Sequence, residues 1–191
     1  MHIPGGGVGG HCLPKDPWLL KYGVTEYGKT PLQLDVIEAS RYRNITMPKH
    51  MIELFEDCLN PTQLNNPSKV KVAVLGVAFI EDSDDPRNTP TKDLVLILKE
   101  KRYDISIHDP FVRQDDFDFS FSSNLEEVLR DSNAIIIITA HQLYKDLDLG
   151  YITSLMKSNP ILIDGRTTFE PSQILKHGFK YRAIGRGQYQ D

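Results

Sequence analysis

The sequence has little of several features that mark particular classes of protein. Only two of its 191 residues are cysteines, Cys12 and Cys58, too few for the disulfide framework of a small secreted domain. No apolar run is as long as a membrane span, and the start has neither the charged n-region nor the apolar h-region of a signal peptide. The 22 basic residues do not outnumber the 26 acidic ones, and a net charge of −4 does not favour nucleic-acid binding. We therefore expect a cytoplasmic protein with neither nucleic acid nor a membrane among its partners.

The sequence also lacks the fingerprint of a dinucleotide site. No predicted strand runs into the GxGxxG turn that holds the pyrophosphate of NAD. The first predicted strand continues as Gly76-Val77-Ala78-Phe79, with one glycine where the fingerprint needs three. Asp109, at the end of the next strand, occupies the place of a ribose-binding acid but stands there without those glycines. We expect a nucleotide-type fold that does not itself hold NAD.

The composition is otherwise that of a soluble globular domain, with 40% hydrophobic and 25% charged residues. A chain of this length can bury one core, or one core with a helical extension. Beyond the first third, apolar runs alternate with amphipathic helical patterns, which predicts an α/β fold with a Rossmann-like, doubly wound parallel sheet. The predicted strands are 70–77, 105–108, 134–138, 161–163 and 181–184, and the predicted helices are 91–101, 123–129, 151–157 and 171–176.

The first third of the chain is predicted to be helical. Residues 19–23 are typical of a short helix closed by its glycine, and Thr30 is a candidate cap for the next helix. Residues 32–59 carry apolar side chains at helical spacing, and Pro48 is expected to kink this helix or to begin a second one. This apolar stripe is longer than one small domain covers, which favours a homodimer through the long helix. A coiled coil is the alternative, and the broken heptads disfavour it.

A polar, turn-rich stretch separates the two patterns. We expect residues 1–59 to form a cysteine loop and a central helical region, residues 60–68 a linker, and residues 69–191 the α/β domain.

The stretch richest in chemistry is residues 4–18. Five glycines precede Cys12, and glycine lets the backbone pass close to a ligand with its amides pointing inward, so this run is expected to cradle an anion. Lys15 and Asp16 follow, which puts a nucleophile, a cation and a base or water-orienting group in one segment. The glycine amides and Lys15 also provide the positive environment that a thiolate needs. We expect a reaction centre here.

These residues resemble a known family. Residues 9–17, GGHCLPKDP, are similar to the catalytic-cysteine segment of the UDP-glucose/GDP-mannose dehydrogenases, and within it to the branch that oxidises UDP-N-acetylmannosamine or a related UDP-N-acetylhexosamine. Family members are considerably longer, so the resemblance covers their C-terminal part. The second half resembles the family's UDP-sugar-binding domain in Gly76-Val77-Ala78-Phe79, in DSDDPRNTP at 82–90, in His108-Asp109-Pro110 and in Ile163-Asp164-Gly165-Arg166.

The resemblance implies an activity and the residues that perform it. A homodimer oxidises the C6 hydroxyl of a UDP-sugar to a uronic acid with NAD, and Cys12 adds to the intermediate aldehyde and carries a thioester that water releases. Asp16 corresponds to a carboxylate that orients water or shares in proton transfer, and Lys15 to the lysine beside it. NAD binds the other domain of the longer relatives, where Arg87 reaches its pyrophosphate. Substrate binding falls to Gly5, Gly6, Gly7, Val8, Gly9, Phe79 and Arg166.

The residues around the cysteine also have plainer interpretations. Cys12 could be a structural cysteine in a turn, and metal ligation is disfavoured because Cys12 and the adjacent His11 lack the spacing of zinc ligands. Asp16 could cap a helix, and Lys15 could be a solvated charge. His11 could be no more than a marker of the branch.

Two residues of the second half raise similar questions. Arg87 could form an ordinary salt bridge with Asp84 or Asp85. Ile80 follows Phe79 where many relatives have a lysine that touches substrate, which weakens the assignment of a nucleotide sugar or shifts the substrate.

The missing fingerprint affects the expected activity. Nothing in the sequence can hold the nicotinamide against the sugar carbon, so we expect this polypeptide alone not to turn over substrate. A glycine loop with only part of its walls should also be weakly ordered or displaced near residues 5–10. Two other functions remain open, namely a non-catalytic fragment that binds UDP-sugar and a dimerisation module that needs neither Cys12 nor Arg166.

Overall fold

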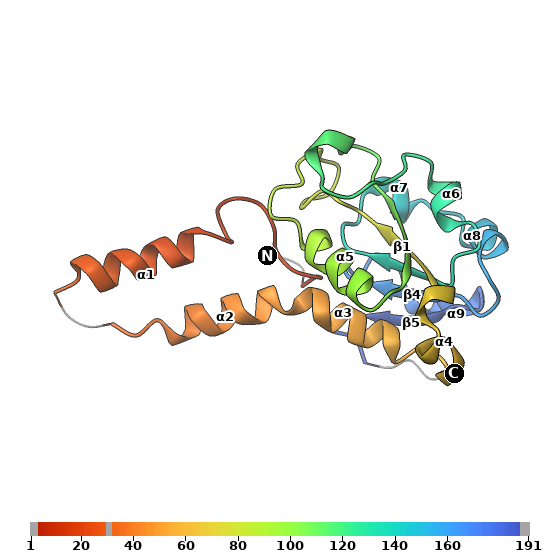
Figure 1. Ribbon diagram of the computed structural model, residues 1–191, viewed down its shortest axis with the longest axis horizontal. Helices are drawn as coiled ribbons and strands as arrows, with labels where there is room; N and C mark the ends of the chain where they lie inside the picture. Colours follow the sequence, from red (N-terminus) through yellow and green to blue (C-terminus); the bar gives the residue numbers. More distant parts are fainter. Residues whose placement is uncertain (1–3, 30–31, 188–191) are drawn as a thin grey trace.

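A sheet of five parallel strands forms the centre of the protein (Figure 1). The computed structural model describes residues 4–29 and 32–187. The strands lie in the order β2-β1-β3-β4-β5, and the inner ones are buried almost throughout, so the predicted α/β, doubly wound fold is confirmed. Their bounds are β1 Lys71–Leu75, β2 Asp104–His108, β3 Ala134–Ile137, β4 Ile161–Asp164 and β5 Lys180–Ala183.

Helices cover both faces of the sheet. On one face, α3 (Met47–Glu56) and α5 (Pro90–Glu100) bury Met51, Phe55 and Leu94 in one hydrophobic core. The other face is covered by α6 Leu125–Leu129, α7 Gln142–Lys145, α8 Leu149–Leu155 and α9 Pro171–Lys176.

The strand order reverses between β1 and β3, which makes their carboxyl ends the switch point of the sheet. Leu75, the last residue of β1, pairs with His108 of β2 and with Ile137 of β3, so these strands end level with one another. The segments that follow them meet at one edge, where ligands of doubly wound folds bind.

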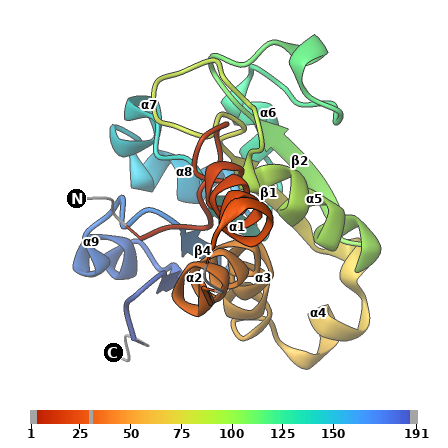
Figure 2. The same cartoon turned by 90° about the vertical axis from the view of Figure 1, so that its left-hand side faces the viewer.

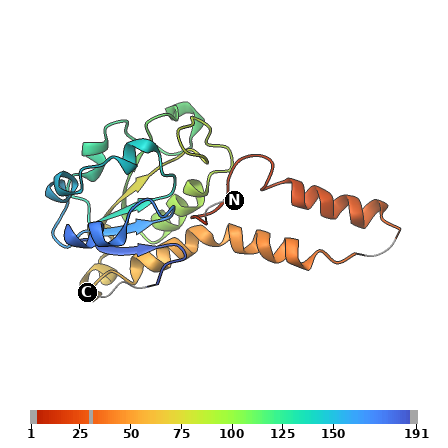
Figure 3. The ribbon, with the colours of Figure 1, turned by 180° about the vertical axis from the view of Figure 1, so that it is seen from behind.

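Two helices project from this domain as an arm. α1 (Asp16–Tyr27) runs away from the domain and α2 (Asp35–Ile45) returns beside it (Figures 1 and 3), and Figure 2 views the pair end on. Neither helix buries a residue, and an ion pair of 2.8 Å joins Lys21 to Glu38 across them. No helix of the described residues is long and apolar enough to span a membrane.

The helical boundaries of the arm differ in part from those predicted. The helix predicted at 19–23 extends from Asp16 to Tyr27, so Gly23 does not close it. A glycine weakens a helix but ends it only where its backbone turns left-handed, and Gly23 has no positive φ. Pro48 lies in the first turn of a second helix, one of the two outcomes expected, because that turn needs no N–H at this position. The predicted cap Thr30 lies outside the described residues.

The predicted linker 60–68 contains structure of its own. Asn60 caps the short helix α4 (Pro61–Asn65), and the 3₁₀ turn η1 (Pro67–Lys69) leads into β1. A second 3₁₀ turn, η2 (Gln114–Asp116), follows β2. The division at 60–68 stays a prediction, although α3, which precedes it, belongs to the core of the sheet.

Candidate functional site

A cavity of about 650 Å³ lies between the glycine loop, residues 5–10, and the loop from β1 to α5, residues 76–89, called here the β1–α5 loop. Phe79 and Arg166 reach it from just past the carboxyl ends of β1 and β4. We call it the cysteine cavity. It is lined by Val8, Gly9, Gly10, His11, Cys12, Leu13, Phe79, Ile80, Glu81 and Arg166.

Hydrogen bonds hold the glycine loop from both sides. The side chain of Asn44 on α2 accepts from the Val8 N–H at 2.9 Å and donates to the Val8 carbonyl at 3.4 Å. On the β1–α5 loop, Asn88 donates to the Gly10 carbonyl at 2.8 Å, and the Arg87 carbonyl accepts from the Gly10 N–H at 2.8 Å. The sequence analysis missed this clamp, because an asparagine in a helix or a loop carries no signal of its distant partner.

The glycines are needed for close packing as well as for ligand approach. A Cβ on Gly9 would lie 2.6 Å from the Phe79 Cβ, and Gly10 combines a φ of +82° with a Phe79 ring carbon 2.9 Å from such a Cβ. The β1–α5 loop thus provides one wall for the glycine loop, and the expected weak order or displacement near residues 5–10 stays a prediction. Among the described residues the Gly9 N–H has no hydrogen-bond acceptor, so it is one of the lining amides that stay available for the predicted anion cradle.

The other predicted loop residues lie around the cavity rather than in it. Gly5 packs against the Arg166 side chain, Gly6 against Met51 and Gly7 against Pro90.

Cys12 lies in a turn that leads into α1. Its carbonyl accepts from the N–H groups of Lys15 at 3.0 Å and of Asp16 at 2.8 Å, and the residue is exposed toward the cavity. Asp16 is the first residue of α1 and does not act as its N-cap, which is Lys15. Lys15 and Asp16 form an exposed ion pair of 3.6 Å and do not line the cavity.

Arg166 is oriented by the sheet. Its Nε donates to the carbonyl of Ile138 at 3.0 Å, and its backbone N–H donates to Asp164 at 2.9 Å. Within the described chain its terminal Nη groups have no hydrogen-bond partner, and burial lowers the pKa of the guanidinium. Its donor geometry suits a phosphate.

Arg87 forms an ion pair in this structure, and its predicted contact with NAD stays a prediction. The Nε of its guanidinium donates to both carboxylate oxygens of Asp85 at 2.9 Å, and this hydrogen bonding lowers the pKa of Asp85. Arg87 does not line the cysteine cavity. The structure thus shows the salt bridge to Asp85, one of the two partners considered.

Asp109 cannot act as a ribose-binding acid because its carboxylate is fully used. One oxygen accepts from the N–H groups of Val77 at 2.6 Å and Ala78 at 3.0 Å and from His141 at 3.1 Å. The other oxygen accepts from two backbone N–H groups just beyond β2. Burial alone would raise the pKa of Asp109, but these bonds, the one from His141 foremost, hold it well below its usual range. The sequence analysis did not identify His141.

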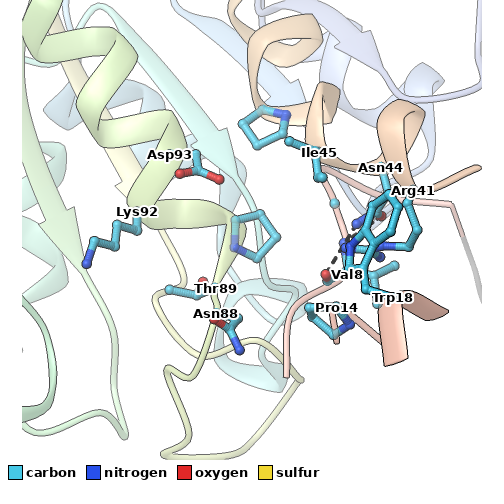
Figure 4. Close-up of a pocket in the computed structure, with 13 residues that line it drawn as sticks. Val8, Pro14, Trp18, Arg41, Asn44, Ile45, Asn88, Thr89, Lys92 and Asp93 are labelled. Carbon is cyan, nitrogen blue, oxygen red and sulfur yellow. Dashed lines mark hydrogen bonds between the residues drawn. The ribbon is translucent and has the colours of Figure 1, made fainter. Parts of the chain in front are cut away.

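A second cavity, of about 300 Å³, lies behind the glycine loop. Figure 4 shows Val8, Pro14, Trp18, Arg41, Asn44 and Ile45 on one side of it and Asn88, Thr89, Lys92 and Asp93 on the other. The Nε of Arg41 is buried there without a partner among the described residues. In residues 4–29 and 32–187, no group of three or more His, Cys, Asp or Glu could hold a metal ion.

A parallel sheet in this order, with a thiol and a guanidinium in one cavity at its carboxyl end, defines a nucleotide-fold domain with a candidate covalent site. The chain belongs to the UDP-glucose/GDP-mannose dehydrogenase family, since residues 73–171 match the UDP binding domain of that family. The resemblance drawn from the sequence motifs is thereby confirmed.

The relatives include enzymes with several sugar substrates. Over 187 residues, 98% of this chain and 41% of the relative, the chain is 35% identical to the UDP-N-acetyl-D-mannosamine dehydrogenase of Pyrococcus horikoshii. The structure of NDP-N-acetyl-D-galactosaminuronic acid dehydrogenase from Methanosarcina mazei Go1 superposes with a TM-score of 0.88 and 37% identity over 97% of this chain and 40% of that one. The UDP-glucose 6-dehydrogenase of Rhizobium meliloti is 28% identical over 95% of this chain and 41% of that enzyme. The chain thus spans about two fifths of the length of these relatives.

Proposed function

We propose that this chain is the C-terminal part of an NAD-dependent nucleotide-sugar dehydrogenase that oxidises the C6 hydroxyl of UDP-N-acetylmannosamine, or of a related UDP-hexose, to a uronic acid. The observation that carries the proposal is that Cys12 and Arg166, from opposite ends of the chain, line one cavity beside the switch point. The names of the relatives from Pyrococcus and Methanosarcina support an N-acetylated sugar.

Different residues of the cysteine cavity are expected to contact different parts of the substrate. The Nη groups of Arg166 and the N–H of Gly9 are the donors for the diphosphate, because a guanidinium binds phosphate through charge-assisted hydrogen bonds. Phe79 and Ile80 form an apolar wall. Where many relatives have a lysine, Ile80 provides no charge, so Arg166 is the principal cation for the diphosphate.

The cysteine performs the covalent step. The Sγ of Cys12 adds to the C6 aldehyde carbon, the aldehyde oxygen takes up a proton, and a thiohemiacetal forms. Once this is oxidised to a thioester, water adds to its carbonyl carbon, the C–S bond breaks, and a carboxylic acid and the free thiol result. We assign the orientation of this water to Asp16, with Lys15 as its charge partner.

NAD, when bound, accepts the hydride in both oxidations. The β1 turn of this chain does not fit the cofactor, because the N–H groups of Val77 and Ala78 that would face a pyrophosphate donate to Asp109. We therefore propose that residues outside this chain hold NAD, and that Arg87 reaches its pyrophosphate after leaving Asp85.

We also propose that the enzyme is a homodimer through the arm. An unpaired pair of helices does not keep so many large apolar side chains in water without a partner. The apolar side chains that the arm exposes include Trp18, Leu19, Leu20, Tyr22, Tyr27, Val36, Tyr42 and Ile45.

An activity assay tests the proposed function. The chain is mixed with NAD and UDP-N-acetylmannosamine, and NADH is followed by absorbance. We expect no turnover by the chain alone and turnover after addition of a separately expressed NAD-binding half. Robust turnover by the chain alone would contradict the assignment of NAD to residues outside it.

Calorimetry with UDP separates the remaining functions. A catalytic part and a non-catalytic UDP-sugar-binding fragment both bind UDP, whereas a dimerisation module does not. If calorimetry detects no binding at millimolar UDP, the chain has no nucleotide-sugar site.

A further inference from the structure

We infer that Asp82 and His141 act as positioning residues that fix the β1–α5 loop, and through it the glycine loop and Cys12, to the segment between β3 and α7. Neither residue lines the cysteine cavity. The inference rests on the proposed function, because it assigns a role in arranging that same site.

Asp82 joins the β1–α5 loop to the start of α7 at two points. Its backbone N–H donates to the Nδ1 of His141 at 2.9 Å, and its carboxylate accepts from the N–H of Gln142 at 2.9 Å. Both partners belong to the segment that follows the buried strand β3, which ends at Ile137. The contact therefore ties the β1–α5 loop to the segment that connects β3 to α7.

The surroundings of His141 determine which nitrogen carries its proton. Nδ1 faces a backbone N–H and must accept, while Nε2 lies 3.1 Å from the carboxylate of Asp109 and must donate. The side chains of His141 and Asp109 are both fully buried, so neither can exchange its partner for water. His141 is thus held in one tautomer and one orientation, with its acceptor directed at Asp82.

The fixed loop carries the residues that hold the cysteine segment. Gly10 is clamped by the Arg87 carbonyl and the Asn88 side chain, and Cys12 follows two residues later. Asp82 and Asn88 both adopt positive φ values, 52° and 50°, a region that is uncommon outside glycine and that Asp and Asn tolerate best. The two-point contact at Asp82 and the clamp at Asn88 hold the loop at these two positions.

Two substitutions of His141 separate positioning from general stability. In His141→Asn the side-chain oxygen replaces Nδ1 and keeps the bond to Asp82, whereas in His141→Gln the longer amide replaces Nε2, keeps the bond to Asp109 and loses the bond to Asp82. Hydrogen exchange of the chain reports on residues 79–88 and 7–12. We expect exchange there to be about five- to tenfold faster in His141→Gln and close to wild type in His141→Asn.

A surface variant avoids disturbing the buried histidine. Asp82→Gly removes the carboxylate but tolerates the positive φ. Asp148→Gly is its matched control, because Asp148 caps α8 through the Tyr151 N–H at 3.0 Å in the same way but lies outside the loop. We expect faster exchange in residues 7–12 for Asp82→Gly only.

Calorimetry with UDP on the same variants completes the test. We expect a Kd about five- to tenfold higher for His141→Gln and Asp82→Gly, and unchanged values for His141→Asn and Asp148→Gly. Equal hydrogen-exchange rates of residues 79–88 and 7–12 in His141→Gln and His141→Asn would overturn the inference, even if the two variants differ in melting temperature. If the wild-type chain itself does not bind UDP, the proposed function fails, and hydrogen exchange alone decides on the positioning role.

Discussion

At the scale of single residues, a hydrogen-bond donor can bind a ligand only if it has no acceptor within the protein. Arg166 and the β1 turn differ in this respect. The Nε of Arg166 is held by the Ile138 carbonyl, and this aims a guanidinium whose Nη groups stay unused within the described residues. The N–H groups of Val77 and Ala78 in the β1 turn are not available to a ligand, because they donate to the carboxylate of Asp109. A phosphate is therefore expected at Arg166.

Replacing this arginine tests that expectation. Arg166→Lys keeps the positive charge but loses the planar pair of donors, and we expect the Kd for UDP, measured by calorimetry, to rise about ten- to a hundredfold. Arg130→Lys on α6, where the arginine is exposed beside Glu126, is the control and should bind as the wild type does. Equal affinity in both variants would contradict the assignment.

Asp109 should matter for stability rather than for binding chemistry. In Asp109→Asn the amide faces N–H donors, so we expect a loss of about 3 kcal/mol in the free energy of unfolding at pH 7, measured with urea. Because the folded-state pKa of Asp109 lies below its unfolded value of about 3.9, its contribution is complete above that pH and is lost as the pH falls. The gap between the two proteins should therefore narrow below about pH 4, and a gap that widens in acid would contradict this role.

At the scale of the elements, the strands and four of the connecting helices could be predicted, whereas the short helix α7 could not. A strand such as β3 can be recognised in the sequence as an unbroken apolar run, because it is buried on both faces of the sheet. α7 has only four residues, too few for a hydrophobic period, so neither this helix nor His141 before it could be predicted. The glycine loop was predicted as a ligand site, but its tight fit against Phe79 depends on a loop far away in sequence.

The glycine loop provides the prediction at this scale. Gly10 and Gly178 have similar positive φ values, +82° and +78°, but a Cβ would meet the Phe79 ring only at Gly10 and nothing within 4 Å at Gly178. Gly10→Ala and Gly178→Ala should each lower stability by about 1 kcal/mol through the backbone. Only Gly10→Ala should also weaken UDP binding, by about tenfold or more, because the loop must move away from Phe79. Equal UDP affinities in calorimetry would count against the packing role.

At the scale of the whole molecule, the arm is the feature that motivates the proposed homodimer. Its helices extend beyond the domain and bury no residue of their own (Figures 1 and 3). The sequence analysis predicted one apolar stripe over residues 32–59, but the apolar side chains gather on one face in α3 and not in α2. It could not show that α3 belongs to the core while α2 buries no residue, since that depends on what each helix packs against.

Sedimentation velocity tests the dimer. We expect a dimer at micromolar concentration and a monomer for the double variant Val36→Asp/Tyr42→Asp, because these side chains are 80% and 72% exposed in one copy and should be covered in two. The control Leu96→Asp, at an exposed position of α5, should remain a dimer. A monomeric wild-type chain would contradict the proposal.

Alkylation of Cys12 tests most directly whether the cysteine and the nucleotide sugar share one site. In a Cys58→Ser background, iodoacetamide can modify only Cys12, and mass spectrometry follows the rate with and without UDP-N-acetylmannosamine. We predict that saturating UDP-sugar slows the modification at least tenfold, and that Arg166→Lys shifts this protection to higher concentrations. A chain that binds UDP-sugar in calorimetry while Cys12 reacts at an unchanged rate would contradict the site proposed here.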